Sequence, residues 1–145
     1  MDHPHVATLR TWFHRLLVDR DYAVIETLRD DRSESEGIAP ELVRGVPDFR
    51  RLHQALAAIA RITKVEITEA VIEGDHVAIL VCASGATTGG KPFRLEGAAF
   101  LDFEGGKIRR ARNLWSTGAL AEALGVSAAL SLDEIAVAAA TTSAT

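Results

Sequence analysis

The sequence contains a single cysteine, Cys82, among 145 residues, and one thiol cannot form a disulfide within the chain. Such scarcity is usual in the reducing cytoplasm, which is the location we expect. The longest apolar runs fall far short of the roughly 20 residues that a membrane-spanning helix needs. Residues 1–5 have neither the basic nor the apolar stretch of a signal peptide, so we expect no membrane partner.

Positive charge is also in short supply. The chain has 16 Lys and Arg against 20 Asp and Glu, which gives a formal net charge of −4. An acidic balance does not attract a phosphate backbone, so nucleic acid is not an expected partner. His3 and His5 lack a second pair of ligands, and we expect no metal site. The length fits one domain that can enclose a core and a pocket.

The first half of the chain has the periodicity of helices. Apolar residues recur every three or four positions over residues 6–17, and the pattern resumes over residues 22–28. The irregular segment 30–45 predicts a loop with a short strand, or one helical turn at Pro40–Val43. Pro47 suits the first turn of a third helix, whose apolar face runs from Phe49 to Ala60.

After Thr63 the apolar period changes to two, which is typical of strands. Glycine-containing turns divide this half into consecutive hairpins, so we expect an antiparallel, curved sheet. A short helix over Gly118–Leu124 comes last, and Gly125 is placed to end it. The strands after the first hairpin turn are predicted over His76–Ala86, Pro92–Phe103 and Lys107–Trp115.

The C-terminal residues differ in composition from the rest. Ser131 and Glu134 have the spacing of a capping box, which predicts one more short helix. Beyond Ala136 the sequence has no charge and no large side chain, so it buries too little surface to become ordered. We therefore expect a domain over residues 1–125 and an extension over residues 126–145 that is partly helical or disordered.

Several short motifs follow one another in a characteristic order. They are Leu28-Arg-Asp-Asp31, Ile72-Glu-Gly-Asp-His-Val77, Phe103-Glu-Gly-Gly-Lys-Ile108, Leu114-Trp115 and Leu120–Gly125. With these motifs, the stretch from His5 to Gly125 resembles the SnoaL-like polyketide cyclases of the nuclear-transport-factor-2-like superfamily. The resemblance implies an α+β, cone-shaped (cystatin-like) fold, in which three N-terminal helices pack on a strongly bent antiparallel sheet. It also implies a hydrophobic small-molecule substrate, no cofactor, and homodimers paired through the outer face of the sheet.

The resemblance suggests where the catalytic groups of two related classes would fall. The acid or base of SnoaL-like cyclases corresponds to Asn113, an amide that cannot exchange a proton near neutral pH but can donate a hydrogen bond. The charged set of limonene-epoxide-hydrolase-like members corresponds to Leu80, Cys82 and Asn113. Because none of these residues carries a charge that could activate water, we do not expect epoxide hydrolysis.

Ketosteroid-isomerase-like members suggest a different set. Their base corresponds to Glu36, and their oxyanion donors fall at Trp12 and Ala98. Trp12 offers an indole N–H, whereas Ala98 offers no donor. Glu36 is thus a possible proton acceptor, and its alternative is a loop carboxylate in solvent.

The expected cavity is unusually apolar. Residues two apart on a strand share a face, and we expect the faces that hold Leu80, Phe100 and Asn113 to point inward. Glu96 would then be a desolvated carboxylate with a raised pKa, or else a surface partner of Arg94 or Arg112. Candidate catalytic residues are Glu36, Glu96 and Asn113, and candidate substrate-binding residues are Trp12, His53, Leu80, Cys82, Ala98, Phe100 and Trp115.

These features lead us to expect an enzyme of natural-product biosynthesis. It would be a cyclase, a lyase or isomerase of antibiotic biosynthesis, that folds a polyketide-like intermediate in an apolar cavity for ring closure or rearrangement. The missing charges favour a non-catalytic binding module for a hydrophobic small molecule as an alternative. A second alternative is a ketosteroid-isomerase-like isomerase that uses Glu36 as its base.

Overall fold

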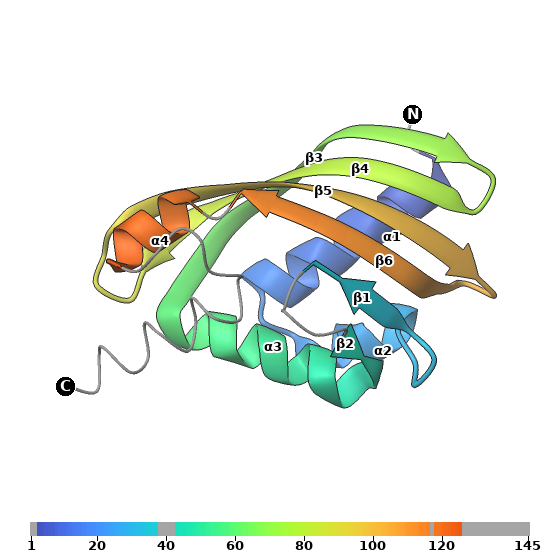
Figure 1. Ribbon diagram of the computed structural model, residues 1–145, viewed down its shortest axis with the longest axis horizontal. Coiled ribbons are helices and arrows are strands. Elements are labelled where there is room, and N and C mark those ends of the chain that lie inside the picture. The colour runs from blue at the N-terminus through green and yellow to red at the C-terminus, as the bar shows by residue number, and fades with distance from the viewer. Residues whose placement is uncertain (1–2, 38–42, 117, 126–145) are drawn as a thin grey trace.

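Four long strands make up most of the second half of the chain: β3 (Ala60–Glu73), β4 (His76–Thr87), β5 (Pro92–Glu104) and β6 (Lys107–Ser116). Each pairs antiparallel with the next, as the hairpin pattern predicts. The computed structural model describes residues 3–37, 43–116 and 118–125, and its sheet is strongly bent (Figure 1). β3 has two register shifts against β4, and such bulges increase the bend of a strand.

The sheet is mixed, which corrects the expectation of a purely antiparallel one. Its order is β2-β1-β6-β5-β4-β3, where β1 (Glu34–Glu36) runs parallel to β6 and β2 (Val43–Arg44) runs antiparallel to β1. A helix and three long strands separate β1 from β6 in the sequence, so no hairpin fixes their relative direction. The helical turn expected at Pro40–Val43 lies largely outside the described residues.

The helices lie on the concave side of the sheet (Figure 1). The break between the two N-terminal helical segments falls where the periodicity predicted it, at Arg20, whose left-handed φ of 56° interrupts the helical path. Each segment is further divided into an α-helical part and a π or 3₁₀ turn. The predicted α+β cone is otherwise confirmed, and α4 (Gly118–Leu124) has the expected bounds. The remaining helical segments are α1 (Pro4–Phe13), a π-helical turn (His14–Val18), a 3₁₀ turn (Tyr22–Val24), α2 (Ile25–Leu28) and α3 (Gly45–Ile59).

The inner and outer faces of β4 and β5 are opposite to those expected. Leu80 is 43% exposed and Phe100 is 55% exposed, while Cys82, Glu96 and Ala98 share their outer face. The expectation that these five residues point inward is therefore wrong, because a shift of one residue exchanges the two faces of a strand. The residues that do point into the core, each almost fully buried, are Val77, Ile79, Val81 and Ala83 on β4 and Leu95, Ala99 and Leu101 on β5.

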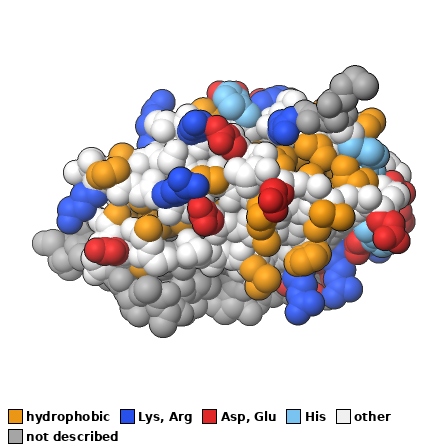
Figure 2. All heavy atoms as spheres, turned by 90° about the horizontal axis from the view of Figure 1, so that it is seen from above, with side chains coloured by type: hydrophobic (Ala, Val, Ile, Leu, Met, Phe, Trp, Pro, Cys, Tyr) orange, Lys and Arg blue, Asp and Glu red, His pale blue; other side chains and the backbone are white. Residues whose placement is uncertain are grey.

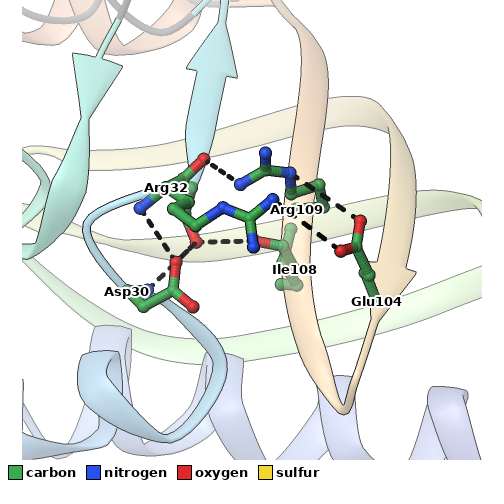
Figure 3. Close-up of polar contacts among 6 residues, drawn as sticks. Asp30, Arg32, Glu104, Ile108 and Arg109 are labelled. Atoms are coloured by element: carbon green, nitrogen blue, oxygen red, sulfur yellow. Dashed lines mark hydrogen bonds and ion pairs between the residues drawn. The ribbon is translucent and has the colours of Figure 1, made fainter.

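The loop that follows α2 is fastened to β6 (Figure 3). Ser33 Oγ donates to the Ile108 carbonyl oxygen over 2.7 Å, and Arg109 Nη1 donates to the Arg32 carbonyl oxygen over 2.9 Å. Within the loop, the Arg32 N–H donates to Asp30 Oδ1 over 2.9 Å. These bonds fix the backbone just before β1, and with it the direction in which Arg29, the residue before this loop, enters the molecule.

Among the described residues, no helix has both the length and the apolar character needed to span a membrane. The extension expected over residues 126–145 lies outside the part of the chain that the structure describes.

Gly97 supports the indole of Trp115, its pairing partner on β6. A Cβ at Gly97 would stand 2.4 Å from Trp115 Cε3, so Gly97→Ala must displace the ring. Overpacking of this kind costs about 1–3 kcal/mol. We expect Gly97→Ala to lower the free energy of unfolding by about that amount, measured by urea titration with circular dichroism.

Gly118→Ala is the matched control for this substitution. Nothing lies within 4 Å of its added Cβ, and alanine is the better residue in a helix such as α4. We expect Gly118→Ala to leave the free energy of unfolding unchanged or to raise it. Equal losses in the two variants would mean that the contact between Trp115 and Gly97 is not the cause.

Candidate active site

A small, mostly apolar cavity lies between α1, α3 and the inner face of the sheet. The space open to the centres of water-sized molecules is about 50 Å³, and one water needs about 10–15 Å³. The cavity thus holds a few small groups without any movement of side chains. Its polar lining residues are Arg29, His53 and Asn113, with the indoles of Trp12 and Trp115, and the other lining side chains are aliphatic or phenylalanine.

Arg29 brings a buried charge to this cavity. It directly follows α2, is 4% exposed, and its Nη1 donates to Ser35 Oγ over 2.5 Å. Its Nε has no hydrogen-bond partner, and no carboxylate pairs with the guanidinium within the described ranges. Charged side chains are almost never buried this deeply without a partner. The empty Nε position is therefore the most unusual feature of the cavity.

Aromatic rings enclose the guanidinium of Arg29. Its Cζ lies 4.3 Å from the ring centroid of Phe49 and 5.7 Å from that of Trp12. The attraction between a cation and these ring faces offsets part of the lost hydration. Burial lowers the pKa of Arg29 from its ordinary value to about 9, so the group stays protonated at neutral pH. The cavity therefore has a positive charge at one wall.

His53 lies one helical turn after Phe49 on α3. Its Nδ1 is 3.0 Å from the Phe49 carbonyl oxygen, which can only accept, so this bond assigns the proton to Nδ1 and leaves Nε2 as an acceptor. Burial lowers the pKa of His53 to about 4, with a smaller contribution from the positive charge of Arg29, while the hydrogen bond to the Phe49 carbonyl acts in the opposite direction. His53 is therefore neutral at pH 7 and able to accept a proton.

Asn113 and the two tryptophans line the cavity, as the sequence predicted. Asn113 Nδ2 donates to the Glu36 carbonyl oxygen over 3.1 Å, a bond that ties β6 to β1. Trp12 is 3% exposed, and its Nε1 has no partner among the described residues. The indole N–H of Trp12 is thus a second buried donor that is unused in the structure.

Glu36 and Glu96 do not reach the cavity. The Glu36 carboxylate pairs with Arg110 over 3.0 Å in solvent, and Glu96 pairs with Arg94 over 3.0 Å on the outer face. Of the two alternatives considered for Glu36, a base in the cavity or a carboxylate in solvent, the structure shows the carboxylate in solvent. For Glu96, the prediction of a surface carboxylate that pairs with Arg94 is confirmed.

Leu80, Cys82, Ala98 and Phe100 do not line the cavity either. On the outer face, a more open hollow of about 530 Å³ lies beside Leu80, Cys82 and Glu96. Leu80 and Cys82, which were expected to line the ligand cavity, therefore line a surface depression on the other side of the same strand. Within the described residues, no group of three or more His, Cys, Asp or Glu side chains is arranged to hold a metal ion.

Arg29 and Phe49 are the site residues that sequence reasoning missed. Arg29 belongs to the Leu28-Arg-Asp-Asp31 motif, where one charged residue among three gives no sign of being buried. Phe49 was recognised as part of the apolar face of α3, which is also the position of any core residue. Arg29 and Phe49 contact each other only because the fold brings the loop after α2 against α3, and the sequence does not show this contact.

Comparison with known proteins identifies the family. The model of the SnoaL-like domain matches residues 9–111, more than half of the chain. No curated protein gives a significant match.

Solved structures share the fold at low sequence identity. A candidate isomerase from Rhodopseudomonas palustris is 21% identical over 86% of this chain and 99% of its own, with a TM-score of 0.73. A protein with a ketosteroid isomerase-like fold from Catenulispora acidiphila, in complex with trimethylamine, is 20% identical over 90% and 99%, with a TM-score of 0.71. A candidate SnoaL-like polyketide cyclase from Shewanella denitrificans is 13% identical over 85% and 98%, with a TM-score of 0.67. At these identities the likeness concerns the fold alone.

The pKa of His53 predicts a pH-dependent loss of stability. The folded protein holds the imidazole neutral down to about pH 4, whereas the unfolded chain protonates it near pH 6.5. The unfolded state thus binds the extra proton between these values, so stability falls as the pH is lowered through this window. We expect wild type to lose about 2–3 kcal/mol more than His53→Gln between pH 7 and pH 4.5, measured by urea unfolding.

His14→Gln is the control, because His14 is exposed and pairs with an exposed Asp19. This variant should follow the wild-type pH dependence. If His53→Gln also follows it, the imidazole is not held neutral by burial.

Proposed function

The chain belongs to the SnoaL-like domain family, and we propose that it is a cyclase or isomerase that moves a proton on a small carbonyl compound without a cofactor. The observation that supports this most directly is His53. Its side chain lines a mostly apolar cavity, and its Nε2 is left unprotonated at neutral pH. A base of this kind is what proton removal next to a carbonyl requires.

The proposed step begins when His53 Nε2 takes a proton from a carbon next to a carbonyl group of the substrate. The electron pair of the broken C–H bond forms a C=C bond, and the carbonyl oxygen becomes an enolate. The unused N–H of Trp12 is a candidate donor to that oxygen. The enolate carbon then attacks a second carbonyl, whose oxygen becomes an alkoxide and takes the proton back from His53, and a ring is closed. Alternatively, the proton returns from His53 to a different carbon, which completes an isomerisation.

The low pKa of His53 limits the substrates that this step can use. A base with a pKa of about 4 is weak, although a base near 4.6 suffices in ketosteroid isomerase. Carbon acids activated by a neighbouring carbonyl, as in polyketide-like intermediates, suit such a base best. Because the cavity is small, we propose that a short or partly cyclised intermediate binds, with side-chain movement where the ligand is larger.

A non-catalytic carrier is the second candidate, and the absence of carboxylates from the described lining favours it. In the enzyme, His53 transfers the proton, and Glu36 and Glu96 do not; in a carrier, no residue does. Asn113 keeps a place in the lining as a donor or as a support for β1.

Hydrogen–deuterium exchange at carbon tests the proposed activity. We expect the protein to accelerate exchange next to the ketone of 4-oxopentanoate or 2-pentanone in D₂O, followed by proton NMR. Removing a general base costs about 10²–10⁴-fold in rate, so His53→Gln should lose most of the acceleration. His14→Gln should retain it, because His14 is exposed and away from the cavity.

Binding of the same ketones is measured in parallel through the fluorescence of Trp12 and Trp115, which are the two tryptophans of the chain. Ketones that bind without any accelerated exchange would contradict the enzyme and support the carrier.

We also propose that two copies pair through the outer face of the sheet. This face has an exposed apolar band: Leu80, Phe100 and Leu114 are 43%, 55% and 62% exposed, and Val71 is 72% exposed. Seen from the sheet side, hydrophobic side chains gather between scattered charges (Figure 2). Contiguous exposed apolar surface of this kind marks an interaction site.

The charges around this band suit a second copy of the same face. Acidic and basic side chains alternate along its edges and already form pairs, such as Lys64 with Glu66 and Arg94 with Glu96. A surface that carries both signs can meet itself about a twofold axis without net repulsion. The hollow beside Leu80 and Leu114 offers space for a side chain of the second copy.

Phe100→Asp tests the dimer, because it places a charge in the middle of the apolar band. We expect wild type to sediment as a dimer and Phe100→Asp as a monomer with unchanged circular dichroism. Gln54→Asp, an exposed change on α3, should remain dimeric. A monomeric wild type, or a dimer that survives Phe100→Asp, would contradict the proposed interface.

A further inference from the structure

Arg29 has no role in the proposed proton transfer. Among the described residues, the hydrogen bond of its guanidinium is made by Nη1 to Ser35, while Nε is fully enclosed and has no partner. Nε and Nη2 form one planar edge of a guanidinium, and this edge can donate two parallel hydrogen bonds. The molecule therefore buries a positive charge whose Nε–H donor is unused among the described residues. Because Nε is fully enclosed, a ligand reaches this edge when the neighbouring lining side chains move.

The guanidinium is held firmly in this position. Ser35 Oγ fixes one end, and Ser35 itself is fully buried on β1 beside Ala111 of β6. Phe49 supports the guanidinium plane from α3 at 4.3 Å. Three separate elements thus hold Arg29 before any ligand arrives, which lowers the entropic cost of binding one.

We propose that the free edge of Arg29 binds a carboxylate of the small molecule that enters the cavity. The carboxylate receives two parallel hydrogen bonds from the guanidinium, and the hydrocarbon part of the ligand lies against Trp12 and Phe49. This inference rests on the proposed function, since the anchored ligand is the substrate on which His53 acts. It makes the substrate a keto acid or a similar monoanion.

Charge balance favours a carboxylate over a phosphate. Arg29 is the cationic side chain in the described lining, so a monoanion leaves a neutral pair and a dianion leaves a buried negative charge. Shape favours it as well, because a carboxylate is planar and matches the fork of two N–H groups. The few small groups that the cavity admits are enough for a carboxylate and a short chain.

The anchor also places the ligand near the base. Phe49 contacts both side chains, with its ring centroid 4.4 Å from that of His53 and 4.3 Å from Arg29 Cζ. A ligand held by Arg29 therefore extends its next carbons along the Phe49 ring toward His53. Binding and proton transfer are thus assigned to two different residues that both lie close to Phe49.

Butyrate, its neutral isostere butyramide, and methylphosphonate are the probes for this proposal. Each is titrated into the full-length protein while the fluorescence of Trp12 and Trp115 is recorded, since both line the cavity. A hydrogen bond to a charged group contributes about 1.5–3 kcal/mol, so we expect butyrate to bind roughly 10–100-fold more tightly than butyramide. Methylphosphonate should bind more weakly than butyrate at a pH where it is a dianion.

Two variants locate the preference at Arg29. Arg29→Met keeps a long side chain but no charge, and it should bind butyrate and butyramide equally. Arg29→Lys keeps the charge without the planar edge, and its preference should be smaller than that of wild type. Equal binding of the two probes by wild type, or an unchanged preference in Arg29→Met, would overturn the proposal. If Arg29→Met does not fold, the test rests on two comparisons. Wild type must prefer butyrate to butyramide, and Arg29→Lys must show a smaller preference than wild type.

His53→Gln separates this inference from the proposed activity. It should keep the wild-type preference for butyrate over butyramide, because the charge that sets this preference belongs to Arg29, while losing carbon exchange. A protein that prefers butyrate but never exchanges deuterium would retain the anion site and lose the proposed activity. A protein that exchanges deuterium but does not prefer butyrate would retain the proposed activity and lose the anion site.

Discussion

The cavity depends on one constraint, the burial of the protonated guanidinium of Arg29 against Phe49 and Trp12. A charge withdrawn from water is costly unless the surrounding structure holds it and its hydrogen-bonding groups are used. The fold meets part of this requirement through Ser35, which reaches Arg29 because β1 is paired with β6. The loop bonds from Ser33 and Arg109 keep that pairing in place. The rest of the requirement, at Nε, is left for a ligand.

The same strands serve two surfaces because side chains alternate along them. The inward residues of β4 and β5 that line the cavity, Ala83, Leu95, Ala99 and Leu101, are aliphatic, and Gly97 makes room for the indole of Trp115. The outward residues of these strands carry the apolar band that contains Leu80 and Phe100. An apolar outer face has no partner within the described chain, which is why the dimer proposal and the cavity proposal draw on different side chains of the same sheet.

Much of the architecture could be predicted from the sequence, whereas the lining of the cavity could be predicted only in part. Strand bounds follow from glycine turns, and the bounds of α4 follow from Gly125. The faces of β4 could not be chosen by alternation, because Leu80 and Cys82 are as apolar as their inward neighbours. On β5 the signal was present: Arg94, Glu96 and Asp102 alternate on one side, and charged residues belong outside. A register shift between β5 and β6 at Phe103 also makes counting back from the last turn unreliable.

The position of Arg29 gives a reason for the absence of an acidic residue at position 113, one of the expected catalytic positions. An aspartate at position 113 would put a carboxylate in the lining of the same cavity as Arg29, and the two would attract each other across a medium of low dielectric constant. Such an internal pair would satisfy the guanidinium and leave no free edge. Asn113 instead uses its amide to hold β1 and adds no charge. A neutral residue there, with a neutral His53, is what keeps the cation unpaired and reserves it for an anionic ligand.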